Sequence, residues 1–177
     1  MKKFLIGLLM YFIFILLYFI QADFFNWFTI AGVGPNIFII FILFLGLFTD
    51  NKFSICIALL TGITLDLVIG KTLGVTAIMF CLVAIIANYF DKNFSKDSRM
   101  TIMFMVSGAT IIFEVLKYFL NYIFLATNVE IFNFIIILII ETIYNVIMTI
   151  ILYPLIQKFG YYIENEYKGN KILTRYF

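Results

Sequence analysis

Six long runs of apolar residues, separated by short polar stretches, occupy most of the 177-residue chain. A transmembrane helix needs about 20 consecutive apolar residues, within a range of about 17–25, to cross the hydrocarbon core of a bilayer. The runs cover about residues 4–20, 35–49, 53–69, 74–90, 100–125 and 132–156. They predict an all-α integral membrane protein with a single domain (1–177), a bundle of six transmembrane helices, and a polar cytoplasmic tail over 157–177.

The composition excludes most soluble functions. Hydrophobic residues make up 64% of the chain and charged residues 12%, whereas a soluble domain is about half apolar and a quarter charged. The chain has no histidine, the commonest metal ligand, and its net charge of +2 gives no sign of nucleic-acid binding. We therefore expect no metal, no cofactor and no nucleic-acid partner, and contacts with membrane lipid.

Lysine and arginine residues predict the orientation, because they are concentrated in cytoplasmic loops. With six spans, one side of the membrane holds both termini and nearly all basic loop residues, and the other side holds only Lys71. The basic residues on the first side are Lys2, Lys3, Lys52, Lys92, Lys96, Arg99, Lys158, Lys168, Lys171 and Arg175. Both termini are therefore predicted to be cytoplasmic.

A carboxylate stands near the end of the third run, in the segment GITLDLVIGKTLG. An acidic side chain at a bilayer centre costs about 2.5–3.5 kcal/mol on insertion scales. Asp66 shares a four-residue spacing with Ala58, Gly62 and Gly70, and small residues on one helix face let another helix approach closely. Asp66 could bond neighbouring backbone or the GKTLG turn, contact a partner protein, or belong to a ligand or ion site.

A second polar group is predicted in the last two runs. Glu114 and Lys117 are three positions apart and so neighbours on a helix. Folding the last two runs as an antiparallel hairpin brings Glu141 to the level of Lys117. Charges inside a membrane usually pair within the bundle. The cluster could be a structural ion group, or it could form part of a transport or proton path.

Catalytic motifs are absent from the sequence: it has no histidine dyad, no GxSxG and no phosphate-binding loop. The chain is therefore predicted not to be an enzyme.

Residues 34–90 resemble the MreD family, the rod shape-determining membrane proteins of bacteria. The resemblance lies in Pro35 at the start of the second run, the turn over residues 50–52, Gly62 with Asp66, and the turn containing Gly70, Leu73 and Gly74. Size and the six predicted spans also match. The candidates for helix packing or partner docking are Pro35, Ala58, Gly62, Asp66, Gly70 and Gly74.

The resemblance implies a role in the elongation machinery of the bacterial cytoplasmic membrane. MreD-like proteins are associated with MreC, and the wider assembly that makes peptidoglycan includes MreB, RodA and its transpeptidase. A non-catalytic membrane scaffold is thus expected. The family is similar in fold to the substrate-binding subunits of energy-coupling-factor vitamin transporters, which supplies an alternative function as such a subunit.

Overall fold

Six α-helices make up the computed structural model, which describes residues 2–69, 73–94, 96–125 and 130–168. They are α1 (Lys2–Phe19), α2 (Ile37–Phe48), α3 (Asn51–Ile69), α4 (Val75–Asn93), α5 (Arg99–Leu125) and α6 (Ile131–Lys168). Within these ranges no β-strand forms, and an isolated bridge joins Ile30 to Val33. The all-helical architecture is as predicted.

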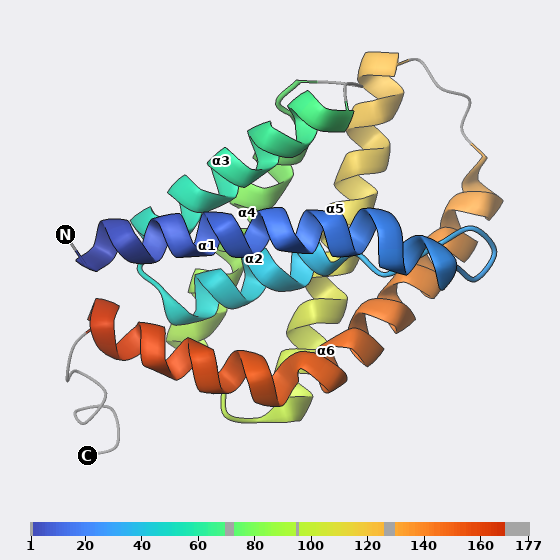
Figure 1. The fold of residues 1–177 in the computed structure, drawn as a ribbon. Coiled ribbons are helices and arrows are strands. Elements are labelled where there is room, and N and C mark those ends of the chain that lie inside the picture. The colour runs from blue at the N-terminus through green and yellow to red at the C-terminus, as the bar shows by residue number, and fades with distance from the viewer. Residues whose placement is uncertain (1, 70–72, 95, 126–129, 169–177) are drawn as a thin grey trace.

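Successive helices alternate in direction, so the start of α1 and the end of α6 lie at the same end of the bundle (Figure 1). We call this the terminal end, and the other end, which carries the α1–α2, α3–α4 and α5–α6 connections, the distal end. Backbone polar groups have no water partner in lipid, and helices satisfy them internally. Long apolar sequence therefore folds here as helix throughout.

Five of the helices are long and apolar enough to cross a membrane, and α2 is the exception. Its 12 residues span about 18 Å at about 1.5 Å per residue, less than the hydrocarbon core of about 30 Å. Eleven of those residues are buried. The six predicted runs thus correspond to five helices long enough to cross a membrane and to the shorter apolar helix α2.

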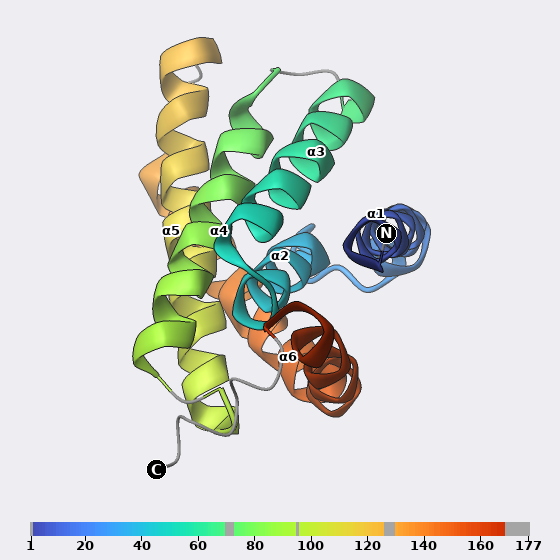
Figure 2. The ribbon, with the colours of Figure 1, turned by 90° about the vertical axis from the view of Figure 1, so that its left-hand side faces the viewer.

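The long helices surround α2 unevenly (Figure 2). α2 contacts all five of them, and α3 packs most extensively on α4. Two glycines allow the close approach to α2: a Cβ at Gly46 would lie 2.5 Å from the Ala87 Cβ of α4, and one at Gly160 of α6 would lie 2.5 Å from the Phe48 ring. α2 therefore contacts α4 and α6 closely at positions where glycine has no side chain.

The sixth helix is longer than the sequence predicted. It continues beyond residue 156 to Lys168, into the range expected to be a polar tail. It contains Pro154, which removes one backbone hydrogen bond, and the helix changes direction along its length (Figure 1). The extension returns α6 to the terminal end of the bundle.

Candidate functional site

Asp66 caps the beginning of α4. Its Oδ2 accepts hydrogen bonds from the backbone N–H groups of Gly74 (2.8 Å) and Ala77 (3.4 Å), and its Oδ1 accepts one from that of Thr76 (3.2 Å). The first N–H groups of a helix lack partners within the helix and carry partial positive charge. This arrangement matches the first alternative for Asp66, bonding to neighbouring backbone, and explains how an acid that is 4% exposed is tolerated.

Of the small residues before Asp66, Gly62 packs against α4. Ala58 and Gly62 are buried, and a Cβ at Gly62 would lie 2.3 Å from the Ala77 Cα. Gly74 has a φ of +93°, which favours glycine, and Gly70 lies outside the described residues. The described part of this stripe packs within the chain and leaves no free face there for a partner helix.

The charge cluster assembles at the distal end. Lys117 Nζ lies 3.0 Å from Glu114 Oε1 on the same helix, and electrostatic interactions join both groups to Glu141 of α6. Glu114 is 7% exposed and Glu141 6%. The ion pair between Glu114 and Lys117 lies on α5, and Glu141 of α6 lines the same cavity as Lys117.

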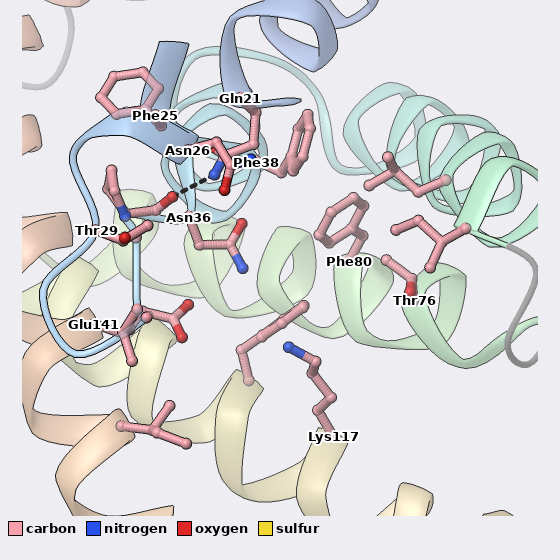
Figure 3. A pocket seen from close by; sticks show the side chains of 18 residues that line it. Gln21, Phe25, Asn26, Thr29, Asn36, Phe38, Thr76, Phe80, Lys117 and Glu141 are labelled. Atoms are coloured by element: carbon pink, nitrogen blue, oxygen red, sulfur yellow. Dashed lines mark hydrogen bonds between the residues drawn. The ribbon is translucent and has the colours of Figure 1, made fainter. Parts of the chain in front are cut away.

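A cavity of about 470 Å³ opens beside this cluster (Figure 3). Its wall comes from the α1–α2 connection and from every helix after α1. The polar lining residues are Gln21, Asn26, Thr29, Asn36, Thr76, Lys117 and Glu141, and the rings are those of Phe25, Phe38, Phe80 and Phe113. These polar groups come from the membrane spans as well as from the connection between α1 and α2.

Hydrogen bonds fix one side of the cavity. Gln21 donates to the Pro35 carbonyl (2.6 Å) and accepts from the Ile37 N–H (3.2 Å), so it ties the connection to the start of α2. Asn145 Oδ1 accepts from the Asn36 N–H at 2.7 Å. Two buried acceptors, Glu141 Oε1 and Asn36 Oδ1, have no hydrogen-bond partner in the described part of the chain.

An apolar groove follows the other side of the bundle, between α1 and α6, with α2 as its floor. It encloses about 310 Å³. The residues that line it are Met10, Ile13, Phe41, Phe44, Leu45, Phe48, Thr49, Leu155, Ile156, Phe159, Gly160 and Ile163. We call it the α1–α6 groove; it lies nearer the terminal end.

Lys96 forms a second buried ion group at the terminal end. Its ammonium lies 2.9 Å from Asp91 Oδ1 and 2.5 Å from Glu164 Oε1, and it donates to the Leu47 carbonyl at 3.1 Å. The side chains of Lys96, Asp91 and Glu164 are 11%, 8% and 5% exposed. The cation thus joins α4, α6 and the carboxyl end of α2, where helix carbonyls lack partners.

Among known families, the model described as "rod shape-determining protein MreD" matches residues 1–163. The chain belongs to the MreD family. It is accordingly a rod shape-determining, multi-pass membrane protein, as the resemblance over residues 34–90 predicted. No curated protein and no solved structure matches the chain. The similarity of this MreD protein to energy-coupling-factor subunits stays a prediction.

The match to MreD includes the cavity and the α1–α6 groove and ends one residue before Glu164. Sequence reasoning missed the Lys96 group, because Lys96 was assigned to a loop and Glu164 to a tail. Its one sequence signal is a lysine between two acids in the segment DKNFSKD. Across the described residues, no group of three His, Cys, Asp or Glu could hold a metal ion.

Proposed function

We propose that this MreD protein is a non-catalytic scaffold of the bacterial cell-elongation machinery, which binds the membrane helix of an MreC-type partner in the α1–α6 groove. The observation that carries the proposal is the groove itself, an apolar channel between two long helices. Through this partner the chain would act with MreB, RodA and its transpeptidase in peptidoglycan synthesis.

The groove suits a single membrane helix. α1 and α6 are the two least buried of the five long helices, and α2 lies between them as the floor. Association of helices in lipid depends on close van der Waals packing, since lipid tails are as apolar as leucine. Atoms around an unfilled space lose those contacts, and apolar side chains of a partner helix that lies along α1 and α6 would restore them by entering the groove.

The stripe on α3 is less suited to this purpose, because Ala58, Gly62 and Asp66 are buried, the last two against the beginning of α4. We therefore place the docking surface on the α1–α6 groove rather than on the stripe. The ten basic residues assigned to the terminal side support a cytoplasmic location of both termini in the bacterial cytoplasmic membrane.

Site-specific photocrosslinking tests the docking. Phe159 is exposed and lines the groove, so p-benzoylphenylalanine at this position should crosslink to the membrane helix of a tagged MreC-type partner in cells. The physical reason is proximity, because a helix in the groove lies against this side chain.

Phe104 provides the matched control. It is also an exposed phenylalanine, on α5, which lies far from α1 in Figure 2. The same probe at Phe104 should give no partner adduct. Equal adducts from both positions, or lipid adducts alone from position 159, would exclude the groove as the docking surface.

A further inference from the structure

The cavity at the distal end has the features of a ligand site that the scaffold role does not use. We propose that it binds a small zwitterion: a primary ammonium held by Glu141 and Asn36, joined to an anionic group that faces Lys117. Such a group occurs in the headgroup of an aminophospholipid and in a free amino-alkyl phosphate. The proposal does not depend on partner docking.

The unpartnered acceptors identify the ammonium. Glu141 Oε1 and Asn36 Oδ1 are both buried without a hydrogen-bond partner among the described residues, and a buried acceptor left unsatisfied is costly. Both side chains point into the cavity (Figure 3). A primary ammonium has three N–H donors and can serve both oxygens at once.

The charges agree with this assignment. Lys117 forms an ion pair with Glu114 at 3.0 Å, and Glu141 interacts electrostatically with both groups and with the Asn36 side chain, so one lysine lies beside two acidic side chains. The ammonium of the ligand would place a positive charge beside Glu141, and the anionic group would lie on the side of Lys117. The walls beside it include the rings of Phe25, Phe38 and Phe80, and aromatic faces attract cations.

Lys117 identifies the second group. Its side chain is 43% exposed, and in Figure 3 its ammonium points into the cavity. One of its three N–H donors is directed at Glu114, which leaves others for an anion. A zwitterion matches both ends of this arrangement, whereas a simple cation leaves Lys117 without an anionic ligand group.

The size of the cavity is adequate. Its volume of about 470 Å³ falls within the range of about 300–1,000 Å³ typical of small-molecule sites. It therefore accepts a headgroup or a small free solute, with Gln21 holding the connection that forms one wall.

Binding to the purified full chain in a neutral detergent tests the proposal. Phosphoethanolamine should raise the melting temperature in a concentration-dependent way, because a ligand of the folded state stabilises it. Phosphocholine has the same phosphate but three methyl groups in place of the N–H donors, and it should not. In native mass spectrometry, phosphatidylethanolamine should be retained in preference to phosphatidylcholine.

Variants locate the site. Glu141→Gln should weaken phosphoethanolamine binding by about tenfold or more, as expected for loss of a charged hydrogen bond. Lys117→Gln, at a half-exposed side chain, should weaken it too and serves if Glu141→Gln does not fold. Glu130→Gln, at an exposed residue outside the cavity lining, should bind like the wild type.

The results distinguish the two possible sources of the ligand, a free solute and a lipid headgroup. A shift with phosphoethanolamine supports a free solute, and retention of the ethanolamine lipid alone supports a headgroup. Equal binding of the choline and ethanolamine probes would overturn the proposal, as would unchanged binding by both cavity variants. Absence of binding by every probe at about 10 mM, where even millimolar affinity is measurable, would overturn it as well.

Discussion

Lys96→Met is expected to destabilise the chain by about 3–5 kcal/mol, the cost of removing one partner from a buried ion pair. The substitution leaves Asp91 and Glu164 without the ammonium that lies 2.9 Å and 2.5 Å from them. It also removes a donor from the Leu47 carbonyl at the end of α2. The measurement is the melting temperature in detergent, together with the protein level in membranes.

Lys92→Met is the matched control, because Lys92 is an exposed lysine in the last turn of α4. It should leave the melting temperature nearly unchanged. The double variant Lys96→Met with Glu164→Gln should recover part of the loss, since one of the two acids that faced the ammonium is then neutral. If Lys96→Met melts like Lys92→Met, the ion group does not hold the terminal end together.

Gly62→Ala is expected to be destabilising by about 1–3 kcal/mol or more, the usual cost of overpacking. The added Cβ would lie 2.3 Å from the Ala77 Cα and 2.7 Å from its backbone nitrogen, so α3 and α4 must separate. Because Asp66 bonds the N–H groups at the start of α4, the same movement weakens that cap. A thermal melt in detergent measures the effect.

Gly108→Ala controls for helix propensity. Alanine is more favourable than glycine inside a helix by about 1 kcal/mol, and a Cβ at Gly108 of α5 meets nothing within 4 Å. This variant should be as stable as the wild type or more so. A Gly62→Ala variant that is equally stable would contradict the close contact between α3 and α4.

The positions of the helices could be predicted because uninterrupted apolar sequence in a membrane has few alternatives to helix. The hydrophobic run does not reveal whether protein or lipid covers it. α2 and the other runs look alike in sequence, yet 11 of the 12 residues of α2 are buried and the helix is too short to span a bilayer. The burial of α2 depends on its contacts with the other five helices, and the hydrophobic pattern carries no information on those contacts.

The distal cluster could be predicted in part, because Lys117 and Glu141 lie in consecutive helices joined by a short connection. Hairpin geometry therefore brings them to one level. Lys96 and Glu164 are 68 positions apart and meet only because α6 continues past Pro154 to the terminal end. Likewise, Gln21 reaches the cavity from a π-helical turn, Ile20–Phe24, that continues α1, and Asn36 from the end of the connection to α2, and the hydrophobic pattern specifies neither.

Cell width tests the central claim, that this chain supports rod shape by binding a partner helix in the α1–α6 groove. Rod-shaped cells lacking their own MreD protein would receive either the wild-type chain or the Leu155→Ala, Phe159→Ala double variant, at matched protein levels. Both residues are exposed and line the groove, so the double variant should fold but lose the MreC-type partner. We predict wide or rounded cells for this variant and normal rods for Phe104→Ala; normal rods with the double variant, when the wild-type chain restores shape, would contradict the account.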